Sequence, residues 1–328
     1  MNGVLHWQIS GTRRVIFDRP RIVAILNVTP DSFSDGGLLD TPERALGRAA
    51  RALEEGADGL DVGGESTRPG AAAVPEEEQV RRVVPAVELI RRRLGDGFFI
   101  TVDTTRAGVA RAAFDAGADA VNDVSAGVDD AAMFGLLASA RRGVVLMHRL
   151  SRPGEDRYST DYDRPPRYEQ VEAGGGGDGA LPAVVRAVRA FLLERAAAAE
   201  RAGIAREAIV LDPGLGFGKS VEQNRALIEW TPSLCELGYP VMSALSRKSF
   251  VAALEAGVMG GGGAGAAIPP PGERLAATLR WSAEHVRRGA VLLRVHDVPE
   301  HARLVKERRA SSGVQGPRTG AVGGGSGT

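Results

Sequence analysis

Eight times along the chain, a short apolar run ends at or beside a residue that can hold a proton, an anion or a metal ion. Strands buried on both faces have this continuous Val/Ile/Leu composition, and only their carboxyl ends reach solvent. Polar groups at those ends therefore line one shared site. The runs lead to Asn27, Asp61, Asp103, Asn122, His148, Asp212, Lys248 and His296.

Segments rich in Ala, Arg, Glu and Leu separate these runs. Strict alternation of strand and helix predicts a parallel sheet, and eight such units predict an α/β fold of the closed (β/α)8 TIM-barrel type. A doubly wound open sheet is the alternative, because periodicity does not report closure. We expect strands at 21–28, 59–63, 98–103, 119–124, 143–148, 208–212, 240–245 and 290–296, with helices at 41–56, 76–94, 106–117, 130–141, 181–203, 220–230, 272–289 and 299–309.

The remaining segments flank or interrupt this alternation. Residues 3–17 alternate around a Ser10-Gly11 turn, which predicts a short N-terminal β-hairpin. The length of 328 residues suits one large barrel, so we expect a single domain over residues 1–310. Three stretches of Gly, Pro and polar residues cannot bury enough apolar surface to offset chain entropy. They predict mobile insertions at about 150–180 and 257–271, and a disordered tail at 311–328.

The composition narrows the class of partner and the compartment. With 41 basic and 41 acidic residues, the formal net charge is zero, which gives no reason to expect nucleic acid or a membrane surface as a partner. A single cysteine, Cys235, excludes an internal disulfide and is typical of a reducing compartment. No apolar stretch approaches the ~20 residues of a membrane span, and the first residues lack the pattern of a secretion signal. We therefore expect a cytoplasmic protein that binds small molecules.

GGESTRPG at 63–70 is the sharpest local motif. Its glycines let the backbone approach a ligand, Ser66 and Thr67 offer hydroxyls, and Arg68 offers a planar cationic fork. Pro69 and Gly70 then turn the chain away. This composition predicts a loop that binds an anion, although an ordinary turn with a surface arginine is the alternative.

Arg294 and His296 predict a second part of that anion site. They are two residues apart on a predicted strand, so they point to the same face and can converge on one anion. A lone strand histidine is more often structural, which stays the alternative. Asn27 lies on the neighbouring strand if the barrel closes, and its neutral oxygen suits a Mg²⁺ that bridges phosphate oxygens. We predict a diphosphate beside Asn27, Arg294 and His296.

A second polar group predicts a different ligand. Carboxylates, an amide and an ammonium on successive strands suit the edge of a flat, nitrogen-rich heterocycle. A carboxylate beside such a ring can also stabilise positive charge on an attached carbon. A ring could stack on Phe217 in the glycine-rich DPGLGFGK stretch at 212–219. The alternative is a structural salt bridge between Asp212 and Lys248. This second group comprises Asp103, Asn122, Asp212 and Lys248.

With these residues assembled, the chain resembles the dihydropteroate synthase family of pterin-binding barrel enzymes. The resemblance runs from about residue 20 to 300 and rests on seven motifs in family order. They are ILNVTPDSFSDGG at 25–37, GLDVGGESTRPGA at 59–71, TVDTTRAGVA at 101–110, AVNDVSAG at 120–127, VLDPGLGFGKS at 210–220, SRKSF at 246–250 and RVHDV at 294–298.

The resemblance implies a transferase of folate biosynthesis and a role for each site residue. It would join 6-hydroxymethyl-7,8-dihydropterin diphosphate to 4-aminobenzoate with Mg²⁺, release pyrophosphate and form 7,8-dihydropteroate. The catalytic roles would fall on Asp103, Lys248 and Arg68, and the enzyme would be a homodimer through helices opposite the loop face. The pterin would be held by Asp103, Asn122, Asp212 and Lys248, with Met147 and Phe217 against its ring. Asn27 would contact Mg²⁺ and the diphosphate, and the leaving group would be bound by Thr67, Arg68, Arg294 and His296. The aminobenzoate would be bordered by Phe33, Pro69 and Ser249, on or beside the mobile loops 28–40 and 66–75.

Two departures from the family pattern concern the neighbourhood of this site. Arg149 and Leu150 follow His148 where the family has a short Met/Gly/Thr-Pro run, and Ala244 stands where the family has glycine. Two other readings remain: a pterin-binding methyltransferase module, and a paralogue that binds pterin without turnover. The whole interpretation requires Asp103 and Arg294 to open onto the same surface.

Overall fold

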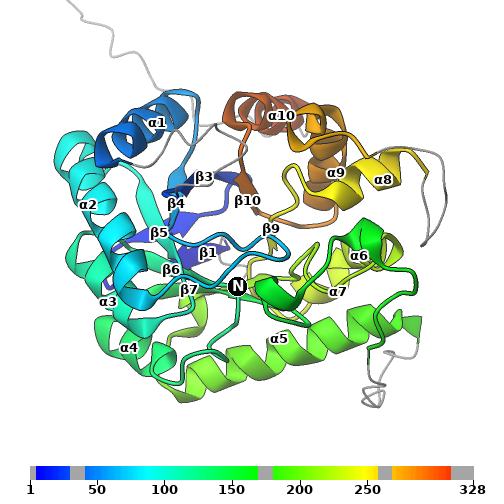
Figure 1. Ribbon diagram of the computed structural model, residues 1–328, viewed down its shortest axis with the longest axis horizontal. Coiled ribbons are helices and arrows are strands. Elements are labelled where there is room, and N and C mark those ends of the chain that lie inside the picture. Colours follow the sequence, from blue (N-terminus) through cyan, green and yellow to red (C-terminus); the bar gives the residue numbers. More distant parts are fainter. Residues whose placement is uncertain (1–4, 30–40, 169–179, 258–267, 312–328) are drawn as a thin grey trace, which may run out of the picture.

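Eight parallel strands form a barrel at the centre of the molecule, and helices form a ring around it (Figure 1). The computed structural model describes residues 5–29, 41–168, 180–257 and 268–311. A parallel bridge between Leu211 and Val241 joins the two end strands, so the barrel closes and the open-sheet alternative is excluded. In spatial order the strands are β8 (Ile209–Asp212), β7 (Gly143–Met147), β6 (Ala120–Asp123), β5 (Phe99–Asp103), β4 (Gly59–Gly63), β3 (Arg21–Asn27), β10 (Leu292–Val295) and β9 (Met242–Ser243).

A helix follows each strand, as the alternation predicted. Eight lie at the predicted positions, and two further short helices, α7 (Thr231–Cys235) and α8 (Ser249–Glu255), fall in stretches where none was expected. The eight are α1 (Pro42–Glu54), α2 (Glu76–Leu94), α3 (Ala107–Asp115), α4 (Met133–Ala140), α5 (Ala183–Arg201), α6 (Val221–Glu229), α9 (Leu275–Arg287) and α10 (Val298–Ser311).

Local capping fixes where several of these helices begin. The Thr41 side chain accepts a hydrogen bond from the Arg44 amide at the start of α1, and a proline occupies its first turn. At the start of α6, Ser220 and Gln223 form a reciprocal capping box. Because α6 follows the 212–219 loop directly, this cap fixes the end of a loop that borders the site.

Two apolar layers build the core. The larger layer lies between the strands and the helices and includes Leu26, Val62, Ile100 and Leu146, all fully buried. The smaller layer fills the amino-terminal end of the barrel, where side chains of the strands meet those of the N-terminal hairpin. Strand ends are thus packed at one end of the barrel, and polar side chains occupy the other.

The predicted N-terminal hairpin is present and closes that amino-terminal end. It consists of β1 (His6–Gln8) and β2 (Arg14–Ile16), which pair antiparallel. Trp7 is fully buried, packs edge-on against Phe99 at a centroid distance of 5.9 Å, and donates its indole N–H to the Ala208 carbonyl at 2.9 Å. The hairpin therefore seals the barrel opposite the strand tips.

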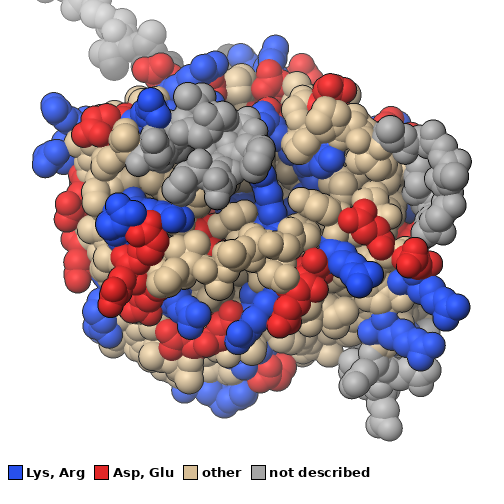
Figure 2. Space-filling model, in the orientation of Figure 1, with Lys and Arg blue, Asp and Glu red and all other residues tan. Residues whose placement is uncertain are grey.

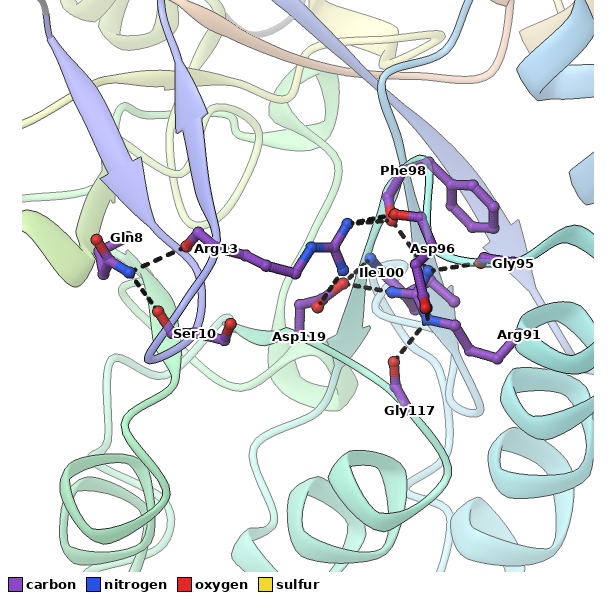
Figure 3. Close-up of polar contacts among 10 residues, drawn as sticks. All are labelled: Gln8, Ser10, Arg13, Arg91, Gly95, Asp96, Phe98, Ile100, Gly117 and Asp119. Carbon is purple, nitrogen blue, oxygen red and sulfur yellow. Dashed lines mark hydrogen bonds and ion pairs between the residues drawn. The ribbon is translucent and has the colours of Figure 1, made fainter.

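A polar cluster, which we call the base cluster, fastens the hairpin to the barrel (Figure 3). The buried carboxylate of Asp119 accepts hydrogen bonds from the guanidinium groups of Arg13, on the hairpin, and Arg91, on α2. The same carboxylate accepts the backbone N–H of Ile100 at 2.9 Å. Two cations thus share one carboxylate at this end of the molecule.

The structure describes residues 150–168 of the insertion predicted at about 150–180. This part contains two short 3₁₀ turns, η1 (Pro153–Glu155) and η2 (Ser159–Asp161). Polar contacts join it to the barrel mouth: Asp156 is buried and bonded to the Gly218 amide, and Ser159 is buried and bonded to Asn224 on α6. Residues 169–179, 258–267 and 312–328, which include most of the second insertion and of the predicted tail, lie outside the described residues.

Acidic and basic side chains are interspersed over the face shown in Figure 2, which agrees with the zero formal net charge. In the described part of the chain, none of the helices is both long and apolar enough to cross a membrane.

Candidate active site

A cavity opens at the carboxyl ends of the barrel strands, where the sequence placed the site. All but two of the predicted site residues line it. Asp103 is buried just beneath, in contact with the lining residue Arg294, and Phe33 lies outside the described residues. The lining includes Asn27, Thr67, Arg68, Pro69, Asn122, Met147, Asp212, Phe217, Lys248, Ser249, Arg294 and His296.

An ion-pair cluster, which we call the mouth cluster, forms the floor of this cavity. The Arg294 guanidinium donates to Asp103 at 2.7 Å and to Asp61 at 2.5 Å. Asp103 and Arg294 therefore lie in contact at the same end of the barrel, with Arg294 in the cavity lining and Asp103 beneath it. The sequence places Asp61 among the strand tips of the shared site but indicates no contact for it; a carboxylate in the middle of the buried strand GLDVG is the sequence signal of a paired charge.

Two carboxylates share one cation here, and their ionisation reflects that balance. Burial raises the pKa of Asp103 to about 7, with Arg294 lowering it and Asp61 raising it further. Burial disfavours the charged form of Arg294, but Asp61 and Asp103 more than offset this and raise its pKa. The charge of Asp103 at the floor of the cavity therefore depends on pH near neutrality.

Asn122 carries the one buried oxygen of this cluster that has no hydrogen-bond partner among the described residues. Its Nδ2 donates to Asp61 at 3.1 Å, which fixes the amide, while Oδ1 is left without a donor. A buried acceptor without a partner costs free energy, so a ligand N–H is the natural donor. Asp212 lies nearby on β8 and uses Oδ1 to accept the Gly214 amide at 2.7 Å. Burial raises the pKa of Asp212, and Lys248 opposes that rise.

Lys248 and Phe217 form an opposite wall. The ammonium lies 4.4 Å from the centroid of the Phe217 ring and donates to the Leu215 carbonyl. Burial lowers the pKa of Lys248 to about 8, against the attraction of Asp212. Phe217 packs with Val124 and Met147 in a small apolar cluster at the mouth. Glycine is required at 216, because its φ is +84° and a Cβ there would lie 2.9 Å from Lys248 Cδ.

His296 differs in one respect from its sequence interpretation. Its backbone N–H and Nδ1 both contact Ser246 Oγ, at 3.2 and 3.1 Å. Burial, followed by the neighbouring cations Arg247, Arg294 and Arg68, holds the pKa of His296 well below its usual range. Burial and this positive charge therefore disfavour the second cation that the sequence interpretation expected at this position.

One strand tip turns away from the cavity. His148 is buried, packs edge-on against Phe191 with ring centroids 5.0 Å apart, and contacts the Lys219 ammonium through Nδ1 at 3.1 Å. Lys219 is fully buried and donates to the carbonyls of Gly214 and Phe217 at 2.9 and 2.8 Å. This lysine therefore holds the 212–219 loop together, whereas Lys248 reaches the cavity.

The described residues offer a magnesium ion no cage of acidic, histidine or cysteine ligands. No group of three or more His, Cys, Asp or Glu side chains in the described ranges could hold a metal ion. Asn27 lines the cavity at the end of β3 and supplies a neutral amide oxygen. That donor set fits a Mg²⁺ that keeps most of its waters and takes its other ligands from phosphate.

Comparisons with known proteins agree with this geometry. Residues 23–296 match the family model described as "Pterin binding enzyme". The dihydropteroate synthase of Streptococcus pyogenes serotype M18 is 39% identical over 89% of this chain and 96% of its own length. The chain belongs to the dihydropteroate synthase family.

Solved structures of this family share the fold. The Xanthomonas albilineans dihydropteroate synthase with 4-aminobenzoic acid is 39% identical, with a TM-score of 0.77 over 95% of this chain and 100% of that one. The same enzyme in complex with 7,8-dihydropteroate gives 36% identity and a TM-score of 0.74, over 94% and 100% of the two chains. A probable bifunctional folylpolyglutamate synthase/dihydropteroate synthase of Haloferax volcanii is 38% identical over 90% of this chain, which spans only 31% of that relative.

The site also contains residues that sequence reasoning did not assign. The cavity lining includes side chains from the 150–168 segment and from the stretch before α9. Their approach depends on how loops distant in sequence fold onto the mouth, which no local pattern reports. These unassigned lining residues include Tyr158, Ser159, Ser246, Arg247 and Arg274.

Proposed function

We propose that this cavity joins 6-hydroxymethyl-7,8-dihydropterin diphosphate to 4-aminobenzoate, giving 7,8-dihydropteroate and pyrophosphate. Membership in the dihydropteroate synthase family makes the chain a transferase. The observation that carries the assignment of the site is the buried, unpaired Oδ1 of Asn122, which lines the same cavity as Asp212 and Lys248. This set has both acceptors and a donor for a nitrogen-rich ring.

The pterin lies at the floor of the cavity. Asn122 Oδ1 and the Asp212 carboxylate accept N–H groups from the ring edge, and Lys248 donates to its carbonyl or ring nitrogen. Met147 and Phe217 supply an apolar surface for the ring faces, supported by their packing on Val124. The arrangement discriminates strongly against rings without these polar edges, because the buried groups would then stay unpaired.

The diphosphate lies toward Asn27 and the GGESTRPG loop. Thr67, Arg68, Arg294 and His296 line that side of the cavity and contact the leaving group. Asn27 would hold Mg²⁺ on that side, and the ion, when bound, would supply positive charge to the diphosphate. The neutral His296 donates one ring N–H, and its pKa rises once the anion is present because an opposite charge favours the imidazolium.

The reaction breaks the bond between the pterin methylene carbon and the diphosphate oxygen and forms a bond from that carbon to the aryl nitrogen. An aromatic amine is uncharged at neutral pH, so it attacks through its lone pair and loses a proton afterwards. The barrier lies in leaving-group departure, which Arg68 assists. The Asp103 carboxylate, with Lys248 orienting the ring, stabilises the positive charge that develops on the methylene. Pro69 and Ser249 border the aminobenzoate, and so does Phe33 of the 28–40 loop.

A homodimer through helices opposite the loop face and a cytoplasmic location complete the proposal. The location is supported by the single cysteine, a free thiol at the half-buried position 235. Sedimentation at several protein concentrations tests the dimer, with a monomer at every concentration as the contrary result.

The activity is tested by incubating the purified chain with the dihydropterin diphosphate, 4-aminobenzoate and Mg²⁺, and measuring pyrophosphate and 7,8-dihydropteroate. Formation of both products in equal amounts is expected, and chelation of Mg²⁺ with EDTA should stop it. Pterin binding without pyrophosphate would identify a silent paralogue instead. A methyltransferase module would bind pterin, release no pyrophosphate and require a methyl acceptor.

A further inference from the structure

The 153–162 segment contains a buried carboxylate that the proposed reaction does not use. This segment borders the cavity, and its residues Tyr158 and Ser159 belong to the lining. Asp156 in the same segment is 7% exposed and lies close to the cavity without lining it. A buried carboxylate is costly unless it is bonded, so its partners indicate its role.

Both carboxylate oxygens of Asp156 are engaged. Oδ2 accepts the backbone N–H of Gly218 at 2.8 Å, and this contact is buried. Oδ1 accepts the Tyr162 hydroxyl at 2.8 Å and the Arg157 amide at 2.8 Å. Gly218 follows Phe217 directly and has a φ of +65°, so the Asp156 contact fixes the backbone next to the ring that faces the pterin.

The same segment holds the 212–219 loop at a second point and reaches another loop of the site. Asn224 on α6 donates to Ser159 Oγ at 3.0 Å and accepts the Gly216 amide at 2.6 Å through Oδ1. The Pro153 carbonyl accepts the Gly70 amide of the GGESTRPG loop at 2.9 Å. The segment therefore joins the loop under the pterin to the loop beside the diphosphate.

We infer that Asp156 is a positioning residue, whose carboxylate fixes the 212–219 loop, and through it Phe217 and Lys248, for binding of the pterin. The inference rests on the proposed function, because it concerns the same cavity. The residue belongs to the stretch after β7, and its contacts give that polar stretch partners on the neighbouring loop.

The charge of Asp156 gives this role a signature that simple loop support would lack. Burial lowers the pKa of Lys248 to about 8, and the positive charge of Arg294 on β10 lowers it further. Three carboxylates act in the opposite direction: Asp212 on β8, Asp103 on β5, and Asp156. Neutralising Asp156 therefore lowers the pKa of Lys248 further. If pterin binding needs the charged ammonium of Lys248, binding is then lost at a lower pH than in the natural protein.

The test compares Asp156→Asn with a matched control, Asp163→Asn, which removes an exposed acid from the same stretch. Asparagine keeps the shape of the side chain but accepts at only one end and carries no charge, so the bond to the Gly218 amide is either lost or no longer charge-assisted. Titration calorimetry with the dihydropterin diphosphate and Mg²⁺ from pH 6 to 9 should show about tenfold weaker binding for Asp156→Asn, the size expected for one lost charge-assisted hydrogen bond. The basic limb of its binding profile should also move to lower pH, while Asp163→Asn matches the natural protein.

Two results would overturn the inference. The first is that Asp156→Asn binds the dihydropterin diphosphate as tightly as the natural protein does. The second is that it binds more weakly while the basic limb of its binding profile stays at the same pH, which would mean that Asp156 only supports the loop. Thermal melting of each variant confirms that the compared proteins are folded. The proposed function is judged separately by turnover of the natural protein: if turnover is absent while the pterin binds, the activity is disproved and the binding comparison still decides the role of Asp156.

Discussion

The two ends of the barrel use the same chemical groups in opposite proportions. In the base cluster two arginines, Arg13 and Arg91, share one buried carboxylate, Asp119 (Figure 3). In the mouth cluster two buried carboxylates, Asp61 and Asp103, share one arginine, Arg294. Among these groups, cations therefore outnumber carboxylates in the base cluster and carboxylates outnumber cations in the mouth cluster. Outside them, the exposed Asp96 lies 4.0 Å from Arg91 at the base, and Arg68, Arg247 and Lys248 line the cavity at the mouth.

The difference extends to hydrogen bonding. The spare N–H groups of the base cluster end on backbone carbonyls: Arg13 donates to Asp96 and Phe98, and Arg91 to Gly117 and Phe98. In the mouth cluster Asn122 Oδ1 is buried without a partner among the described residues. A buried acceptor without a partner needs an explanation, and for Asn122, which lines the cavity, the proposed ligand supplies one. The comparison therefore separates structural from functional ion pairs within one barrel.

The largest predicted effect comes from removing the mouth cation. Arg294→Met leaves Asp61 and Asp103 buried without a counter-charge and removes a group from the leaving-group side. We expect kcat/KM to fall by about 10³-fold, the size seen when a preorganised charge stabiliser is lost.

Arg13→Met is its control at the base. Arg91 still neutralises Asp119 there, and Arg13 is one-third exposed, so unfolding free energy should fall by only about 1 kcal/mol with kcat/KM unchanged. Steady-state kinetics and urea unfolding measure the two quantities. If Arg294→Met kept kcat/KM within tenfold of the natural protein, the functional reading of the mouth cluster would be wrong.

The second effect concerns the ionisation of the mouth cluster. Stabilisation of a cationic methylene requires the Asp103 carboxylate in its charged form. Because burial raises the pKa of Asp103 to about 7, kcat/KM should decline as the pH falls below about 7. Asp103→Asn should lower kcat/KM by about 10²-fold and abolish this acid limb.

Asp119→Asn at the base provides the contrast for the pH profile. It alters an acid of the same type in a similar burial, so it should reduce stability but keep the acid limb. Rates measured from pH 5 to 9 at a temperature where both variants are folded decide the matter. An acid limb that persists in Asp103→Asn would assign it to another group.

Much of the mouth could be predicted from the sequence because strand alternation is strict. The rule that strand tips of a parallel barrel meet at one end placed Asn27, Asn122, Asp212 and His296 in one cavity, although they are far apart along the chain. The same rule could not tell that the His148 side chain turns outward, since the residue that ends a strand can face either the barrel or the helices. Its neighbours Lys219 and Phe191 decide that direction.

Contacts between loops were beyond prediction for a different reason. The Gly/Pro-rich composition of residues 150–168 correctly indicated little apolar burial, but it does not report whether the polar groups find partners. Asp156 meets the Gly218 amide across 62 positions of sequence. The partners of the base cluster are similarly remote: Arg13 and Asp119 lie 106 positions apart. Pairs of this kind depend on tertiary packing rather than on any local pattern.

The smallest effect tests the unpaired oxygen itself. Asn122→Ala removes Oδ1, which has no partner, and one hydrogen bond from Nδ2 to Asp61. In the absence of ligand, the unfolding free energy should therefore fall by only about 1 kcal/mol.

The effect of Asn122→Ala should be clearest in the presence of ligand. The dihydropterin diphosphate at about 100 times its Kd should stabilise the natural protein by about 2.7 kcal/mol. At the same ligand concentration, this increment should be about 1 kcal/mol smaller in Asn122→Ala, because the ring loses an acceptor. Asp119→Asn should show the reverse, a larger loss without ligand and an undiminished increment. Urea unfolding measures the increment in the natural protein, Asn122→Ala and Asp119→Asn. Equal increments in all three would mean that Asn122 Oδ1 does not bind the ligand. The comparison of the mouth and base clusters would then not separate functional from structural groups in this barrel.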